Sequence, residues 1–371
     1  MIIKTNTFIS IKELFNQALN ISSSKTFTVI FLILLAGIIE PIGLVGLLST
    51  ISVLIEQTGT ISTNPIINNF FLSYPSLLNI EILLLFLVCI GFLKTALLFI
   101  CGSSITKFHY FISKYLRNSL IENLFRANWL YISKQSSGLV TAKLIAEAHR
   151  SSTSFNAIFH IIQTLIFSFI FIIFGLFLNW KFTIIVTITG IIILIFLQII
   201  VNLSRKYGVK ETIYTRKLLE SCNEDFSNLK TFKAMGLTSR LIIQLKKKIY
   251  GLYNSQAQIA ILSLLRTLIA EPMFLSFLIV IFYFFIIPMK IPISEVTVLF
   301  LIFVRISMLL TKLQTYVQKI AVTENAYWNL KNDIDRSKKF KESYHGTKTI
   351  SYKKTIRFSN VYFNHKRKEV L

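Results

Sequence analysis

Five ionisable residues lie deep inside long apolar stretches of the sequence and are the first candidates for chemistry, while Lys312 lies near the inner end of its stretch. The five are Glu40, Lys94, Arg266, Glu271 and Arg305. A charged side chain at the centre of a bilayer costs about 2.5–3.5 kcal/mol on insertion scales, so each needs a partner or a water-filled cavity. Lysine and arginine donate strong hydrogen bonds to phosphate and carboxylate groups. The sequence therefore predicts a cavity that binds an anionic group through noncovalent contacts, with no catalytic residue.

Internal pairing is the alternative interpretation, in which Glu40 or Glu271 neutralises Arg305 or Arg266 across neighbouring helices. At 1.5 Å per residue, Glu40 lies about 20 Å beyond the start of its apolar stretch, and Arg305 lies about 15 Å beyond the start of its own. Glu271 falls at a similar depth. The two interpretations are compatible if only some of the charges pair, and both stay open.

These residues must be positioned by membrane-spanning helices, which the composition indicates. Apolar residues make up 53% of the chain and charged residues only 15%, which excludes an ordinary soluble enzyme. A span needs about 20 predominantly apolar residues. Pro41 and Pro272 each directly follow a glutamate inside such a stretch and predict helix kinks. Six stretches qualify as spans, at residues 27–55, 81–101, 157–178, 182–201, 259–287 and 295–315.

The basic residues are distributed unevenly between the segments outside the spans. Of 40 Lys and Arg residues, 34 fall in segments 1–26, 102–156, 202–256 and 315–371, and only 2 fall in the connections on the other side. This asymmetry predicts that both termini and both long segments are cytoplasmic in a multi-pass inner (plasma) membrane protein. It accounts for most of the net charge of +23 without nucleic acid, for which the basic stretches show no recognition motif.

The two long basic segments and the N-terminus favour helix. Segments 102–156 and 202–258 contain no proline, and they predict extensions of the spanning helices about 20 Å beyond the membrane. Apolar residues within 1–26 share one face of a short helix, which suggests an interfacial amphipathic helix; a loose tail is the alternative. The cysteines Cys89, Cys101 and Cys222 have no metal-ligand spacing, so we predict no metal site.

This layout resembles the transmembrane domain of a type I ABC exporter, also called the type IV ABC fold. The stretch "WLYISKQSSGLVTAKLIAEAHR" (129–150) is similar to the first intracellular loop of that family, and "ESCNEDFSNLKTFKAMGLTSR" (220–240) is similar to the second. The resemblance implies that the turns in these loops contact ATP-binding domains. The coupling residues that it implies are Tyr131, Ser133, Gln135, Lys230, Phe232 and Gly236.

The C-terminal stretch "IRFSNVYFNHKRKEVL" (356–371) alternates as a β-strand does, with Ile356, Phe358, Val361 and Phe363 apolar. The family resemblance implies that these are the first strands of a truncated nucleotide-binding domain, with His365 at the adenine-stacking position. The sequence contains no Gly-Lys pair and hence no P-loop. We therefore expect that this chain is not an ATPase by itself, and that ATP and Mg²⁺ serve only the complete transporter.

The expected fold is thus an all-α membrane domain followed by these strands. The predicted divisions are a tail with an interfacial helix (1–26), the transmembrane domain (27–330), a linker (331–354) and the start of the nucleotide-binding domain (355–371). The expected partners are a nucleotide-binding domain in cis or trans, a second transmembrane half in a homodimer or heterodimer, and membrane lipid.

Three local sequences are similar to bacterial lipid-linked oligosaccharide flippases. They are "GIIEPIGLVGLLS" (37–49), "LRTLIAEP" (265–272) and "FVRI" (303–306). This resemblance implies outward movement of an amphipathic, anionic lipid or lipid-linked saccharide. Lys94 departs from it, because arginine would be the better fork for phosphate. The alternatives are a peptide or drug exporter subunit, and a non-transporting remnant or regulatory partner.

Overall fold

The structure is a computed structural model of the whole chain. It describes residues 7–56, 80–281, 283 and 293–342, together with 355, 359, 361–362, 364–365 and 368–369 near the C-terminus. The predicted connections between the first two spans and between the last two therefore lie largely outside the described residues.

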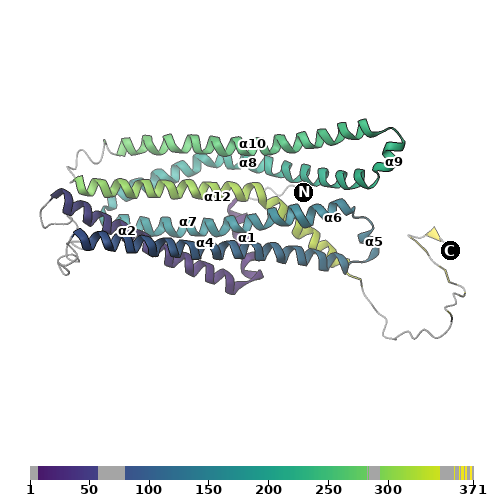
Figure 1. Cartoon of the computed structure of the whole chain (residues 1–371), viewed down its shortest axis with the longest axis horizontal. Helices are drawn as coiled ribbons and strands as arrows, with labels where there is room; N and C mark the ends of the chain where they lie inside the picture. The colour runs from purple at the N-terminus through teal and green to yellow at the C-terminus, as the bar shows by residue number, and fades with distance from the viewer. Residues whose placement is uncertain are drawn as a thin grey trace.

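The described part of the chain is almost entirely helical (Figure 1). Its elements in chain order are α1 (Thr7–Ile21), α2 (Ser23–Glu56), α4 (Ile80–Phe125), α5 (Trp129–Ile132), α6 (Ser137–Ala142), the π-helical turn η2 (Lys143–Glu147), α7 (Ala148–Leu178), α8 (Trp180–Ser227), α9 (Leu229–Ala234), α10 (Thr238–Ile281), α12 (Ile293–Lys339), β1 (Asn364–His365) and β2 (Lys368–Glu369).

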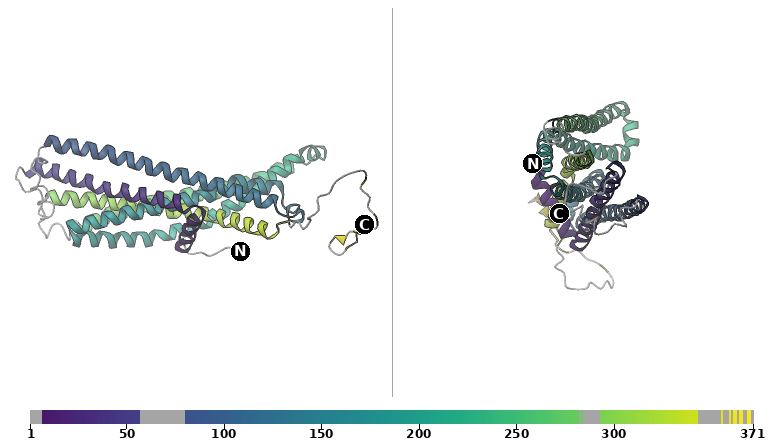
Figure 2. Two further views of the ribbon diagram at one scale, coloured as in Figure 1. Left: turned by 90° about the horizontal axis from the view of Figure 1, so that it is seen from below. Right: turned by 90° about the vertical axis from the view of Figure 1, so that its left-hand side faces the viewer.

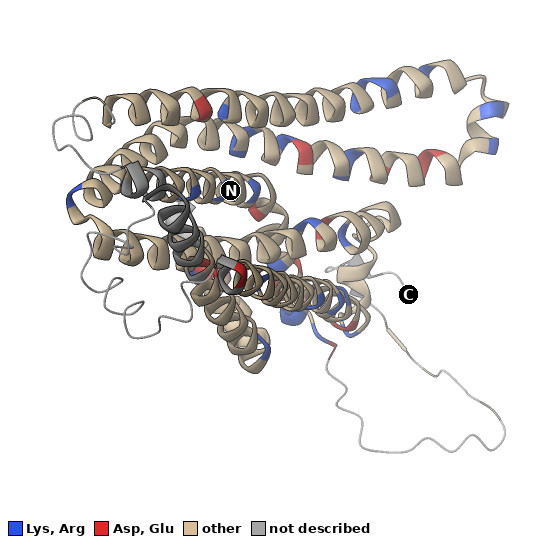
Figure 3. Ribbon diagram, turned by 60° about the vertical axis from the view of Figure 1, so that its left-hand side comes forward, with Lys and Arg blue, Asp and Glu red and all other residues tan. Residues whose placement is uncertain are grey.

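Six of these helices are long and apolar enough to cross a membrane, which confirms the predicted number of spans. They are α2, α4, α7, α8, α10 and α12, with α6 and η2 leading into α7. The α8 helix has 48 residues and is therefore about 72 Å long, more than twice the thickness of a bilayer core. Lys, Arg, Asp and Glu gather toward the end of the bundle that carries α9 (Figure 3). The helices therefore combine an apolar half with a charged extension.

The α7 helix packs against α12, α2 and α4, and these helices run side by side along the long axis of the molecule (Figure 2). Its aromatic side chains fill the interior: Phe155 meets Tyr327 edge to face with ring centroids 5.1 Å apart, and Phe159 meets Phe108 of α4 at 4.8 Å. Such edge-to-face pairs add to the dispersion energy of the packed interior. The amphipathic α1 helix predicted at the N-terminus is present, and it buries Leu14 and Ala18.

Helices α8 and α10 form a second layer that packs on the bundle mainly through α8 and α12. Glycines allow the close approach. A Cβ atom on Gly208 would lie 2.5 Å from the carbonyl oxygen of Val322, and one on Gly190 would meet Leu310. Many outward-facing side chains on the apolar half are large and exposed, such as Phe92 and Phe99 on α4. Since soluble proteins rarely expose such surfaces, this face is suited to lipid.

Short caps organise the turns at the two ends of the bundle. At one end only Asn179 separates α7 from α8, and its side chain accepts a hydrogen bond from the Phe182 amide. At the other end, Asn128 and Ser136 cap α5 and α6, and Gly236 ends the α9 turn with a positive φ of 68°. A positive φ of this size favours glycine, because other residues are strained there.

The C-terminal end of α12 is attached to the segment between α4 and α5. The Asn128 amide donates to the Phe340 carbonyl at 2.8 Å, and the Glu342 amide donates to the Arg126 carbonyl at 2.8 Å. The Tyr131 and Phe340 rings stack with centroids 5.0 Å apart. The α12 helix runs through residues 331–339 of the predicted linker, so this part of the linker is rigid helix.

The prediction that the first β-strands of a nucleotide-binding domain follow the helices is wrong. Val361 and Tyr362 have no regular structure and are 57% and 75% exposed. The described residues there form only a minimal antiparallel pair of two-residue strands, in which His365 faces Lys368. An alternating strand needs an apolar surface to cover its inner face, and an isolated hairpin is marginal in water. Ile356, Phe358 and Phe363 lie outside the described residues.

The contact at Gly208 gives a direct test of the α8–α12 packing. We expect Gly208→Ala to lower the stability of the protein by about 1–3 kcal/mol, because the added methyl group meets the α12 backbone. Thermal unfolding in detergent measures the change. The control is Gly102→Ala in α4, where a Cβ atom meets nothing within 4 Å; it should leave stability unchanged or raise it. Equal effects of the two substitutions would contradict the packing.

Candidate functional site

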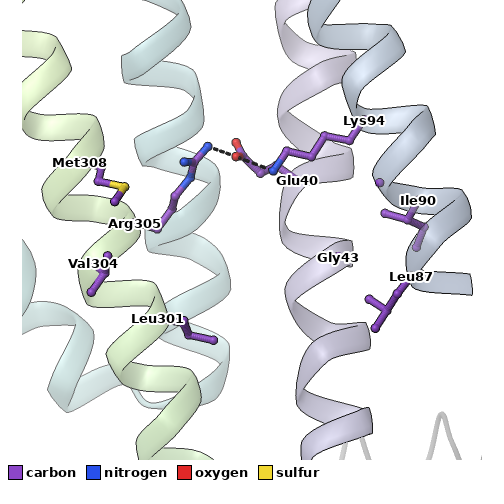
Figure 4. A pocket seen from close by; sticks show the side chains of 10 residues that line it. Glu40, Gly43, Leu87, Ile90, Lys94, Leu301, Val304, Arg305 and Met308 are labelled. Atoms are coloured by element: carbon purple, nitrogen blue, oxygen red, sulfur yellow. Dashed lines mark hydrogen bonds and ion pairs between the residues drawn. The ribbon is translucent and has the colours of Figure 1, made fainter. Parts of the chain in front are cut away.

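Three of the five predicted intramembrane charges come together in one cavity. Glu40 comes from α2, Lys94 from α4 and Arg305 from α12, and they face one another across a cavity of about 420 Å³ (Figure 4). The remaining lining is apolar or glycine: Gly43, Leu87, Ile90, Gly91, Leu301, Val304 and Met308. A small cluster of polar groups in an apolar cavity is the usual form of a ligand site.

Glu40 is the centre of this cluster. Its carboxylate is 3% exposed, and the same oxygen, Oε1, contacts Lys94 Nζ at 3.1 Å and the guanidinium of Arg305. The other oxygen, Oε2, and Arg305 Nε have no hydrogen-bond partner among the described residues. Two cations and one carboxylate leave the cavity with one net positive charge. Apolar walls strengthen every electrostatic interaction inside it, because they lower the local dielectric constant.

The backbone around Glu40 explains how the carboxylate reaches the cavity. Gly37, one turn earlier, packs against α7, where a Cβ atom would lie 2.7 Å from Ile170 and 3.1 Å from Phe167. Pro41 follows inside the helix and has no amide to donate to the Gly37 carbonyl. The helix is therefore held firmly before Glu40 and is locally weakened directly after it.

Arg266 lies apart from this cavity and has neutral partners in the described structure. It is 3% exposed; its Nε donates to Gln318 Oε1 at 2.9 Å and its Nη1 to the Thr311 carbonyl at 3.2 Å. Gln318 in turn donates to Ser204 Oγ at 2.7 Å. This chain of hydrogen bonds joins α10, α12 and α8. Arg266 therefore holds helices together where we had expected a cavity cation.

Glu271, the fifth predicted residue, is exposed on the outward face of α10. No ion pair of Glu271 is found within the described residues. Internal pairing thus holds for Glu40 with Arg305 and Lys94, while Glu271 and Arg266 do not meet each other or the cavity. Lys312, which lies on α12 near the inner end of the last predicted span, is exposed as well.

The predicted coupling residues lie at the charged end of the bundle, in two separate turns. In the first turn, Tyr131 stacks on Phe340, Ser133 donates to the Leu130 carbonyl, and the side-chain oxygen of Gln135 accepts a hydrogen bond from Lys143 Nζ at 3.1 Å. The second turn is the tip formed by α9, where Lys230 and Gly236 are exposed and Phe232 is half-buried. The two turns are the outermost described helical turns at this end (Figure 1).

A buried cluster of charges behind the first turn was not predicted from the sequence. Arg216 of α8 donates to both oxygens of Glu147 at 2.7 and 2.9 Å, and Lys143 Nζ lies 3.1 Å from Asp333 Oδ2 of α12. Burial raises the pKa of the Glu147 carboxyl, and the adjacent Arg216 guanidinium opposes this effect. Glu147 lies within the stretch 129–150 that is similar to the first intracellular loop. Its partner lies 69 residues away, so no local spacing indicates the pair.

Two further ion pairs tie the same helices together nearer the membrane. Arg150 Nη1 lies 2.7 Å from Glu211 Oε1, which joins α7 to α8. Arg205 Nε lies 2.7 Å from Glu324 Oε1, which joins α8 to α12. Charged contacts thus connect the three central helices at successive levels between the first turn and the apolar half.

Comparison with known families agrees with this architecture. The family model for the ABC transporter transmembrane region matches residues 10–324. The chain belongs to this family. The match includes all six spanning helices except the last part of α12, and both turns at the charged end. A search of curated proteins finds no match to the chain.

Membership of the family makes the chain a multi-pass membrane protein and the membrane part of an ABC transporter. Such transmembrane domains generally pair with a nucleotide-binding domain. The resemblance to ABC transmembrane domains is therefore confirmed at the level of the family.

The pair of buried Glu147 and half-buried Arg216 can be tested by removing its charges separately and together. Arg216→Met leaves a buried carboxylate without its guanidinium, and we expect a loss of about 3 kcal/mol in stability. The double variant Glu147→Gln/Arg216→Met should recover most of this loss, since neither charge remains. Thermal unfolding and hydrogen exchange at residues 137–147 measure the effect. The neighbouring exposed Lys217→Met is the control; if it matches Arg216→Met, the pair is not the cause.

Proposed function

We propose that the chain is the transmembrane half of an ATP-driven exporter or flippase, and that it moves an amphipathic, anionic lipid or lipid-linked saccharide outward. The observation that carries the proposal is the cavity formed by Glu40, Lys94 and Arg305, which has an excess of cations in an apolar setting. The family provides the transport context.

The donors of the cavity favour an anionic head group. Arg305 donates to Glu40 through Nη2 and has further N–H groups that can donate to a ligand. Lys94 Nζ has three N–H donors, and Glu40 accepts from it on one side only. Phosphate and pyrophosphate oxygens accept from such groups with charge-assisted hydrogen bonds. Arg266 is not part of this set, because its donors are directed to Gln318 and Thr311.

The walls of the cavity favour a lipid as the carrier of that head group. Leu87, Ile90, Leu301 and Met308 give it an apolar surface, and the Lys94 and Arg305 side chains are 34% and 28% exposed. The cavity is therefore open enough to receive a ligand, and the apolar faces of α4 and α12 continue beside it. A ligand with a charged head and an apolar tail matches both features.

Energy would come from ATP-binding domains that contact the two turns at the charged end. In this proposal, Tyr131, Ser133 and Gln135 of the first turn and Lys230, Phe232 and Gly236 of the second form the contact surface. The charged end and both termini then face the cytoplasm at the inner (plasma) membrane, in line with the excess of Lys and Arg in these segments. The chain itself would bind no cofactor and hydrolyse no ATP; ATP and Mg²⁺ act on the partner domain.

Two other functions differ from this one in their consequences. A peptide or drug exporter subunit would use the same fold, but its transport would not depend on a cation that binds phosphate. A non-transporting remnant or regulatory partner would pair with a second transmembrane half, in a homodimer or heterodimer, without moving substrate. The cavity favours the first function because a purely regulatory chain has no need of charges at this depth.

The test uses the chain fused to a competent nucleotide-binding domain and reconstituted in lipid. Arg305→Ala should raise the concentration of farnesyl pyrophosphate needed to stimulate ATP hydrolysis by at least about tenfold, because it removes a charged hydrogen bond worth about 1.5–3 kcal/mol.

Lys312→Ala is the matched control, since Lys312 is an exposed cation on the same helix. It should leave the stimulation unchanged. If Arg305→Ala is stimulated as strongly as the unsubstituted fusion, the anionic substrate is excluded. Stimulation by uncharged peptides or drugs alone would support the exporter subunit instead.

A further inference from the structure

The anion site in the cavity already holds an anion, which is the carboxylate of Glu40. A single oxygen of Glu40 contacts both Lys94 and Arg305, so it occupies the point where the two cations converge (Figure 4). A phosphate group that bound both cations would need this same position. Glu40 must therefore share the cations or give way when such a ligand arrives.

We propose that Glu40 is a built-in counter-ion that the substrate displaces, and that this exchange makes the cavity select head groups with two or more negative charges. The proposal rests on the anionic substrate of the proposed function. Two cations with one carboxylate have an unbalanced positive charge, and a pyrophosphate group neutralises both cations. A monoanion replaces the single negative charge of Glu40 with another single negative charge, so it gains little binding free energy.

The geometry of Glu40 is suited to exchange. Its second oxygen has no hydrogen-bond partner among the described residues, so the carboxylate is held through one oxygen alone. Arg305 Nε is likewise unpartnered there but is buried, so a ligand would reach the guanidinium through the Nη groups of this side chain, which is 28% exposed. A ligand that engages both cations with separate oxygens makes more hydrogen bonds than Glu40 does.

The backbone allows the carboxylate to move without unfolding α2. Pro41 removes the hydrogen bond to the Gly37 carbonyl, which permits local bending beside Glu40. Gly37 itself is fixed between Phe167 and Ile170 of α7. The movement is therefore confined to the neighbourhood of Glu40 and Pro41.

Displacement of Glu40 also has a structural consequence. The carboxylate is the contact that joins α2 to both α4 and α12 within the cavity. When the ligand replaces it, the cations of α4 and α12 are joined through the ligand, and α2 loses its ionic contact with them. Substrate binding thereby changes which helices are joined by charged contacts at the cavity.

The experiment measures binding of farnesyl pyrophosphate to the full chain in nanodiscs. Glu40→Gln removes the competing charge and keeps the shape, so it should bind farnesyl pyrophosphate about tenfold more tightly than the unsubstituted chain, a coupling of ordinary size between two competing ligands. The affinity for the monoanion phosphatidylglycerol should rise by a larger factor, so that the preference for the pyrophosphate falls. Glu271→Gln, which neutralises the exposed glutamate outside the cavity, is the control and should change neither affinity.

Glu40→Asp is a second variant for the case that Glu40→Gln does not fold because its two cations lack a carboxylate. It keeps the charge on a side chain one methylene shorter, so it should fold and bind farnesyl pyrophosphate more tightly than the unsubstituted chain. In the unsubstituted chain, addition of the ligand should change the infrared carboxylate band, and the change should be absent from Glu40→Gln.

The outcomes separate this proposal from the proposed function. If the unsubstituted chain does not bind farnesyl pyrophosphate, the proposals of an anionic substrate and of a displaceable counter-ion are both contradicted. Suppose instead that it binds, that Arg305→Ala abolishes binding, and that Glu40→Gln and Glu40→Asp bind no more tightly than the unsubstituted chain. Only the counter-ion proposal is then contradicted.

Discussion

The contact of one Glu40 oxygen with Lys94 and Arg305 is the interaction on which the apolar half of this protein depends. A charge inside a bilayer needs a partner or a water-filled cavity, and here the carboxylate is the partner of both cations. The contact joins α2, α4 and α12, which are otherwise held together by dispersion forces between apolar side chains. It fixes the position of the cavity, and a ligand that binds both cations must compete with it.

The α12 helix connects this cavity to the charged end of the bundle. Arg305 and Asp333 lie on the same helix, 28 residues and hence about 42 Å apart. Near Asp333 the helix meets Lys143 and the first turn, and the residues directly after the helix bond to the chain before α5. A continuous helix with ion pairs at both ends can carry a displacement between the two sites without a separate linker. The buried ion pairs at the charged end then serve to fix the turns that face the proposed ATP-binding partner.

The six long apolar helices could be predicted from the sequence, because hydropathy depends on local residues alone. Which charges meet could not, since depth does not fix the direction in which a side chain points around its helix. Arg266 and Arg305 look alike in sequence, yet one is held by Gln318 and the other by Glu40. The pair of Glu147 and Arg216 depends on helix packing over a long separation in the chain. The wrong prediction of strands has another cause: the alternation around Val361 specifies a strand only where a second apolar surface covers it.

We propose that the cavity of Glu40, Lys94 and Arg305 receives the head group of an anionic lipid. The most direct measurement is photolabelling of the chain in nanodiscs with a farnesyl pyrophosphate analogue that carries a diazirine beside the pyrophosphate. We expect labels on the cavity walls, at Ile90, Val304 or Met308, that excess farnesyl pyrophosphate removes. Labels confined to outward-facing residues such as Leu85, Phe92 and Phe99, and unaffected by competitor, would contradict it.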